Sequence, residues 1–286
     1  MFTRRRFNQA LLAGIPASLY AVNSKFHGVQ IGAISYSFRT LKTEEVLPAL
    51  VKAGVGEVEL MSNHAEDLAG GPSQRAREEL IKWRSSVPME KFAAVKKMFD
   101  DAGVHIELLC FNLGLNTNDE EIDYSFRLAK ALGARAITCS TRISVAKMVA
   151  PIADKHKMMW AAHGHDETDK PNEVSSPETF AQITSMGKYM GINLDIGHFT
   201  AANYDPVAFI KENHAKITNL HLKDRKKNHG ANLPWGEGDT PIKAVLQLLK
   251  TEKYPIPANV EYEYKGKDDP VTEVARCVEY AKEALA

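Results

Sequence analysis

Four residues of the types that bind metal ions stand at the ends of four short apolar segments in the second half of the chain. The segments and their polar ends are 158–163 with His163, 191–195 with Asp195, 216–222 with His221, and 257–261 with Glu261. Chemical groups at the C-terminal ends of buried strands are typical of the active face of an α/β barrel. Neighbouring strands lie only about 4.8 Å apart, so consecutive strand ends can meet at one point. The sequence therefore predicts that these four side chains converge on one divalent metal ion.

The predicted ligand set also indicates which metals suit it. Two carboxylates and two neutral imidazoles supply two negative charges, which balance one divalent cation. Mixed nitrogen and oxygen ligands favour Mn, Fe, Co or Zn over Ca or Mg. We expect one divalent ion, with Mn favoured and Co, Fe, Zn or Mg as alternatives.

Each of the four residues also has a purely structural interpretation. A histidine at a strand end can be a hydrogen-bonded core residue, Asp195 can cap the turn after it, and Glu261 can pair with Lys223. The prediction therefore depends on the set, because four metal-binding residue types at four consecutive strand ends form a pattern that none of them forms alone.

The segments that position these residues alternate between two periodicities. From Val29 on, short apolar runs alternate with amphipathic helical patterns, which favours strand-helix units and a parallel sheet. Four further strands are predicted in the first half, at 30–35, 55–61, 104–110 and 134–139. Eight units in 286 residues predict an α/β fold, a single (β/α)8 TIM barrel over residues 22–286.

Local signals mark where the helices begin and end. Helix starts are predicted at the motifs Thr43-Glu-Glu, Thr117-Asn-Asp-Glu and Ser176-Pro-Glu. Helix ends before strands are predicted at Gly54, Gly103, Gly133 and Gly191. Two longer segments interrupt the alternation, residues 62–88 and 226–241. Because long loops after barrel strands lie on the active face, both are candidate lids.

Composition narrows the class of partner. The formal net charge is zero and the pI is about 7.2, so no nucleic acid is expected as a partner. The three cysteines, Cys110, Cys139 and Cys277, are far apart and predict neither disulfides nor a zinc site. The sequence leaves the oligomeric state open.

The first residues predict a targeting segment. Arg4, Arg5 and Arg6 precede Phe7 and a short apolar stretch with small residues near its end. This pattern resembles a twin-arginine export signal over residues 1–21, and a basic N-terminal helix is the alternative. The apolar stretch is too short to span a bilayer comfortably, so no stable membrane anchor is expected. A periplasmic or otherwise exported protein is predicted.

Several motifs resemble the xylose isomerase-like barrel superfamily of sugar phosphate isomerases and epimerases. The resemblance covers nearly the whole chain after residue 21. The motifs are Ile31-Gly-Ala-Ile-Ser-Tyr-Ser-Phe38, Gly56-Glu-Val-Glu-Leu60, Ala162-His-Gly-His-Asp166, Leu194-Asp-Ile-Gly-His198, Leu220-His-Leu-Lys-Asp224, Trp235-Gly-Glu-Gly-Asp239 and Val260-Glu261. Members include epimerases, isomerases, dehydratases, lyases and an endonuclease branch, so the motifs indicate the superfamily and not the substrate.

The resemblance implies a ligand set and a mechanism. Metal ligands in the superfamily are typically Glu, Asp, His and Glu on the last four strands, which Asp195, His221 and Glu261 match. At the first position this chain has His163, or alternatively His165, where the epimerases have a second glutamate. The implied enzyme is a carbohydrate isomerase or epimerase that abstracts a proton next to a carbonyl through a metal-stabilised enediolate. Glu261 would be the base, and His163 or His165 the second acid or base.

Substrate contacts are expected from polar and aromatic residues around the four ligands. His198 follows Asp195 in an Asp-x-x-His pattern that the superfamily shares. The full expected set is Glu59, His198, Lys223, Arg225, Tyr36 and Trp235. Lys223 can instead pair with a ligand carboxylate, and the aromatic residues can instead fill the barrel mouth.

Three other functions remain open on the sequence alone. A β-eliminating lyase or hydratase acting on keto-glycosides would use the same site, and the missing second glutamate favours it. A non-catalytic sugar-binding barrel also fits. An endonuclease IV-like phosphodiesterase would need a three-metal cluster with more His and carboxylate ligands. The neutral pI also disfavours an enzyme that acts on nucleic acid.

Overall fold

Eight parallel strands close into a barrel in the computed structural model, which describes residues 21–72 and 76–286. The strands are β2 (Val29–Ile34), β3 (Glu57–Met61), β4 (His105–Cys110), β5 (Ala136–Ser140), β6 (Met159–His163), β7 (Met190–Asp195), β8 (Ile217–Leu222) and β11 (Ala258–Val260). Each pairs in parallel with the next, and β11 pairs with β2 to complete the ring. The predicted (β/α)8 barrel and its eight strands are confirmed.

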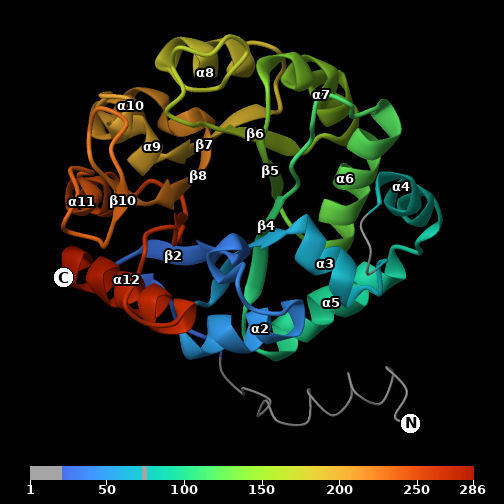
Figure 1. The fold of residues 1–286 in the computed structure, drawn as a ribbon, viewed down its shortest axis with the longest axis horizontal. Coiled ribbons are helices and arrows are strands. Elements are labelled where there is room, and N and C mark those ends of the chain that lie inside the picture. Colours follow the sequence, from blue (N-terminus) through green and yellow to red (C-terminus); the bar gives the residue numbers. More distant parts are fainter. Residues whose placement is uncertain (1–20, 73–75) are drawn as a thin grey trace.

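Helices surround the barrel, as Figure 1 shows in a view along its shortest axis. Their bounds are α2 (Thr43–Lys52), α3 (Ser62–Leu68), α4 (Arg77–Ser86), α5 (Glu90–Asp101), α6 (Asp119–Leu132), α7 (Ile143–His156), α8 (Pro177–Thr184), α9 (Ile196–Ala201), α10 (Pro206–Asn213), α11 (Ile242–Glu252) and α12 (Pro270–Leu285). Short 3-10 turns lie at Ser35–Phe38 and His214–Lys216. No helix in the described part of the chain is long and apolar enough to cross a membrane.

Helix starts follow the predicted capping signals in two of three cases. The Asn118 side chain accepts a hydrogen bond from the Glu121 amide at the start of α6, and Ser176 caps α8. At α2 the helix begins one residue earlier than a Thr43 cap requires. The Thr43 hydroxyl instead donates to Asp67, 2.9 Å away, and so links α2 to α3.

The glycines separate into two structural roles. Gly54, Gly103 and Gly133 have φ near +75° after α2, α5 and α6, the left-handed conformation that ends a helix. The expectation for Gly191 was wrong, because this glycine lies inside β7. An added Cβ there would lie 2.8 Å from Met159 Cε and 3.1 Å from the Lys216 carbonyl oxygen, so a larger residue would displace its neighbours.

The two segments considered as lids are held by specific contacts. In the first, Arg84 of α4 pairs with Glu66 at 2.7 Å and Arg77 with Glu121 at 2.6 Å. In the second, β9 (Asp224–Arg225) pairs with β10 (Asn232–Leu233), and Asp224 accepts hydrogen bonds from the amides of three residues, Gly236, Gly238 and Thr240. A lid function for either segment stays a prediction.

Two further sequence predictions concern the N-terminal segment and the cysteines. The predicted export signal lies outside the described residues, except for Ala21. Cys110, Cys139 and Cys277 are buried and unpaired, and the sequence predicted no disulfide bonds among them.

Candidate metal centre

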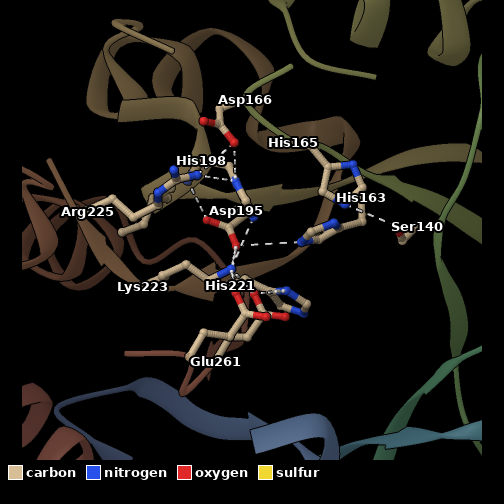
Figure 2. Close-up of polar contacts among 12 residues, drawn as sticks. Ser140, His163, His165, Asp166, Asp195, His198, His221, Lys223, Arg225 and Glu261 are labelled. Carbon is tan, nitrogen blue, oxygen red and sulfur yellow. Dashed lines mark hydrogen bonds and ion pairs between the residues drawn. The ribbon is translucent and has the colours of Figure 1, made fainter. Parts of the chain in front are cut away.

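Four side chains converge at the C-terminal ends of β6, β7, β8 and β11. One ligand atom from each of His163, Asp195, His221 and Glu261 lies within 4.8 Å of the other three (Figure 2). The strand register explains the convergence, because Asp195 lies beside His221 in the parallel pairing of β7 and β8. All four side chains are buried. The structure thus brings the predicted ligand set together.

Asp195 and His221 each use one polar atom for structure and keep the other directed at the cluster. Asp195 Oδ1 accepts a hydrogen bond from the His198 amide at 2.8 Å, which caps α9. His221 Nε2 bonds to Glu59 Oε2 at 2.8 Å, and Nδ1 points to Glu261 Oε2 at 3.3 Å. Asp195 can therefore cap α9, and His221 can bond to Glu59, while each still offers another atom to a metal ion.

The cluster-facing atoms of these residues contact one another and one ammonium group. His163 Nε2 lies 3.6 Å from Asp195 Oδ2, and both Asp195 Oδ2 and Glu261 Oε2 also lie close to Lys223 Nζ. Among the described residues, neither His163 nitrogen has a hydrogen-bond partner, and a buried imidazole without one is costly. Two imidazoles and two carboxylates suit Mn, Fe, Co or Zn. The residues present therefore fit a divalent metal ion.

Lys223 lies directly beside this cluster. Its Nζ is 3.1 Å from Asp195 Oδ2, 2.8 Å from Glu261 Oε2 and 2.6 Å from Glu263 Oε2 (Figure 2). Burial alone would lower the pKa of Lys223, but the three carboxylates outweigh it and raise the pKa. Burial likewise opposes ionisation of Asp195 and Glu261, and Lys223 holds the pKa of both below its usual range. The ammonium and the carboxylates thus keep each other charged.

Glu59 lies below the cluster, in the barrel interior. It is fully buried and accepts hydrogen bonds from Thr138 Oγ1, from Asn219 Nδ2 at 3.0 Å and from Asn259 Nδ2 at 2.9 Å, besides its bond to His221. The structure does not bring it to the cavity where a substrate contact was expected. The reason is the depth of Glu59 along β3. Residues two apart on a strand share a face, and Met61, two residues later, is the one that reaches the cavity.

A set of asparagines that the sequence analysis passed over completes this interior layer. Asn219 Nδ2 donates to Asn193 Oδ1 at 3.0 Å as well as to Glu59. The signal for them was available, because an asparagine stands two positions before three of the four predicted ligands: Asn193 before Asp195, Asn219 before His221, and Asn259 before Glu261. Residues two apart on a strand share a face, so each asparagine lies directly beneath a ligand.

His198 and Arg225 form a second group beside the cluster. His198 Nδ1 lies 2.9 Å from Asp166 Oδ1, and His198 Nε2 lies 3.1 Å from Lys223 Nζ. Burial, and then Lys223, lower the pKa of His198, so a neutral ring donates to Asp166 and accepts from Lys223. Arg225 pairs with Asp166 at 2.7 Å and does not line the cavity. Arg225 was predicted to contact the substrate, but its guanidinium group pairs with Asp166 outside the cavity.

His165 stands on the cavity wall, outside the ligand group. Its Nε2 is 3.1 Å from Ser140 Oγ and its Nδ1 is 3.3 Å from Glu173 Oε1. Burial lowers the pKa of His165 to about 3, helped by the neighbouring His163 and His198. The structure therefore places the two histidines of the 162–166 motif differently, with His163 in the four-residue cluster and His165 beside it.

A cavity of about 370 Å³ opens above the cluster. Its lining includes Tyr36, Lys223 and Glu263, together with Ser140 and His165. Glu263 was not singled out from the sequence, although it shares a face with Glu261 two residues earlier. Such a volume falls within the range of sites that enclose small molecules.

Trp235 is a third predicted substrate contact that lies outside this cavity. Its ring packs edge-on against Tyr280, 5.7 Å between centroids, and lines a separate cavity next to α12. Its indole belongs to the packing of the 226–241 segment on α12.

Comparisons with known proteins agree with this architecture. A family model described as "Xylose isomerase-like TIM barrel" matches residues 47–284. Among curated proteins, L-ribulose-5-phosphate 3-epimerase UlaE of Escherichia coli is 29% identical over 92 residues. That match spans 32% of this chain and 32% of the relative, about a third of its length.

Solved structures show the same fold at low sequence identity. The probable 3-DHS dehydratase AsbF from Bacillus anthracis has a TM-score of 0.65 at 16% identity, over 86% of this chain and 97% of that chain. The IolI protein with a binding zinc atom has a TM-score of 0.63 at 15% identity, over 90% and 96%. At these identities the likeness is one of fold.

Proposed function

The chain belongs to the xylose isomerase-like TIM barrel family, and on that premise we propose that it is a divalent-metal-dependent carbohydrate isomerase or epimerase. The observation that supports this most is the convergence of two imidazoles and two carboxylates from the ends of four strands beneath a cavity. The names of its relatives, an epimerase and a dehydratase, agree with proton abstraction next to a carbonyl. Mn is the favoured ion, and a small carbohydrate is the partner.

The proposed metal site consists of His163, Asp195, His221 and Glu261. A divalent ion held there would supply Lewis-acid stabilisation of negative charge on the substrate oxygens. Glu59 would orient His221 through its hydrogen bond, because ligand histidines are commonly fixed by a carboxylate on the second nitrogen.

Two residues of the cavity are proposed to move protons. Glu261 is kept ionised by Lys223 and His221, so it can accept a proton from the carbon next to the carbonyl. His165 faces the cavity from the opposite wall as a neutral imidazole, and Ser140 and Glu173 fix its ring. His165 therefore takes the second acid or base role in preference to His163, whose Nε2 lies within the ligand group, 3.6 Å from Asp195 Oδ2.

Lys223 is proposed to hold negative charge that develops on the substrate. Its ammonium lines the cavity and is fixed from behind by His198, whose ring is itself fixed by Asp166. A preorganised cation of this kind costs no reorganisation when charge develops.

A β-eliminating lyase acting on keto-glycosides is the second candidate. The observation that favours it is a second cavity, which shares Ser140, His165 and His198 with the first and gives room for a leaving group. Both candidates begin with the same proton abstraction, so they share the metal and the base.

The first experiment is elemental analysis of protein purified without chelators, combined with proton exchange. About one equivalent of Mn, Co, Fe or Zn is expected, together with deuterium incorporation from D₂O next to the carbonyl of ketoses such as ribulose and fructose, followed by NMR. Glu261→Gln should abolish exchange, whereas the surface control Glu279→Gln should not.

Other results of this experiment would change the assignment. About three equivalents of Zn would favour the endonuclease IV-like phosphodiesterase. Sugar binding without exchange in the metal-loaded protein would favour a non-catalytic barrel. Protein that takes up no metal after incubation with Mn or Co would contradict the proposed mechanism.

A further inference from the structure

We propose that the second cavity binds a neutral ring joined to the reacting sugar, so that a glycoside binds more tightly than a free monosaccharide. This inference rests on the proposed function of the metal centre and specifies its substrate. The second cavity measures about 570 Å³ and adjoins the first, because Ser140, His165 and His198 line both. Together the two cavities reach the upper end of the volumes usual for small-molecule sites, about 300–1,000 Å³.

The walls of the second cavity are formed by paired backbone and buried side chains. Arg142 and Glu173 form an antiparallel β-bridge, and their side chains form an ion pair. The His165 amide donates to the Val174 carbonyl at 2.8 Å, which ties the 164–176 loop to its own return segment. A site with fixed walls loses little conformational freedom when it binds a ligand.

Polar side chains in these walls can bind hydroxyl groups. Ser140, Thr141 and His165 line the cavity, and the buried Glu173 lies behind His165, with its Oε1 3.3 Å from His165 Nδ1. Hydroxyl and imidazole groups exchange hydrogen bonds with the hydroxyl groups that sugar rings carry.

The charges of the cavity favour a neutral occupant. Arg142 is paired with Glu173, and the acidic Asp166 and Glu167 also line the cavity. Among the described lining residues, no Lys or Arg without an acidic partner is present to hold a phosphate. The electrostatics therefore disfavour a phosphorylated group at this position.

Apolar groups line the same cavity. Leu113 belongs to the lining, and Leu115, with 67% of its surface exposed, lies at the rim. A sugar ring or an aryl group presents an apolar face and polar edges or attachments, which matches a cavity lined by both leucines and hydroxyl-binding groups.

His165 lies at the junction of the two cavities, because it lines both and its ring contacts Ser140. With one ring above the metal centre and a second ring beside the leucines, the bond that joins the rings would lie next to His165. The proposed site thus has a subsite for each ring.

The test compares binding of four compounds to the metal-loaded full chain by calorimetry: glucose, cellobiose, p-nitrophenyl β-glucoside and glucose 6-phosphate. Cellobiose or the aryl glucoside should bind about tenfold or more tightly than glucose. Cellobiose alone would identify a sugar ring as the occupant, and the aryl glucoside alone an aromatic group.

A blocking variant localises the effect. A Cβ added at Gly114 meets no heavy atom within 4 Å, so Gly114→Trp should fold normally while its indole fills the second cavity. The preference over glucose should then fall to within about twofold, with glucose affinity unchanged. The control is Met148→Trp, an equally bulky change at an exposed position of α7.

Three results would overturn the proposal while leaving the metal chemistry standing. These are equal affinities for glucose and both glycosides, a preference that survives in Gly114→Trp, and tightest binding of glucose 6-phosphate. Failure of all four compounds to bind would overturn the subsite, and absence of metal and of proton exchange would separately overturn the proposed function.

Discussion

His221 bonds to Glu59 through Nε2 and turns Nδ1 toward Glu261, so one imidazole joins the barrel interior to the metal centre. Burial alone would lower the pKa of His221, but Glu59 and Glu261 together raise it well above the usual range. A carboxylate on the far nitrogen both orients a ligand histidine and increases its basicity.

Glu59→Gln is therefore expected to weaken metal binding by about 10–100-fold, because the amide cannot hold His221 as the carboxylate does. The measurement is Mn or Zn affinity by competition with a chelating dye. Glu57→Gln, two residues earlier on β3 and away from the cluster, is the matched control and should leave affinity unchanged. Equal affinities in Glu59→Gln and the wild-type protein would show that Glu59 has no role in orienting the ligand.

Replacing Glu57 with glutamine should increase the free energy of unfolding by an amount that depends on pH. Burial, followed by repulsion from Glu107, raises the pKa of Glu57 from 4.5 to about 7. The folded state thus binds this proton more tightly than the unfolded state, and stability falls as pH rises from 4.5 to about 7. Glu57→Gln should raise the free energy of unfolding by about 1–3 kcal/mol at pH near 8 and by little at pH near 4. Urea unfolding at both pH values measures this, and a pH-independent effect would contradict it.

The two histidines of the 162–166 motif should separate in their effects. His163→Ala removes a proposed ligand and should lower metal affinity by more than about 100-fold. His165→Ala should retain metal affinity within about threefold but lose most proton exchange, because His165 lines the cavity outside the ligand group. Metal content and exchange rates on the same preparations decide between them. The reverse pattern would exchange the assignments of the two residues.

Lys223→Met should have opposite effects on the metal-stripped and the metal-loaded protein. Removing the ammonium leaves Asp195, Glu261 and Glu263 without their shared cation, which should destabilise the stripped protein by about 3–5 kcal/mol. Metal should bind more tightly, because the nearby positive charge is gone, and should restore much of the stability. Thermal unfolding with and without Mn measures this, with Lys282→Met on the surface of α12 as the control.

Export is predicted from the sequence around Arg4 and Arg5. If these residues belong to a twin-arginine signal, replacing both with lysine should retain the protein in the cytoplasm, because that signal is read at the arginine pair. Cell fractionation followed by immunoblotting gives the distribution. Unchanged export of the double variant would argue for another route.

The fold and the convergence of the four proposed ligand side chains were predictable because each depends on a repeated local pattern. Apolar runs ending in His163, Asp195, His221 and Glu261 identify the last four strands and place their ends at one face. Parallel register then brings the side chains together without any further information from the sequence. Gly191 was misassigned because a glycine before an apolar run looks the same whether it ends a helix or lies within a strand.

Positions beyond the ligands were harder to predict, because they depend on depth along a strand and on loop packing. Glu59 lies one layer too deep for a substrate, a difference of two residues. Arg225 is drawn to Asp166, and Trp235 to Tyr280, by contacts between segments far apart in sequence. No periodicity in the chain encodes those pairings.

The layer of Glu59 and the three asparagines has a consequence for how this protein can change. Its hydrogen bonds join β3, β7, β8 and β11, so the same atoms hold the barrel together and set the angle of a metal ligand. A substitution there alters stability and chemistry at once, whereas a change at Leu115 alters only the rim. Variants that accept new substrates should therefore arise by substitution around Leu115, whereas few residues should be tolerated in place of Glu59 and the three asparagines.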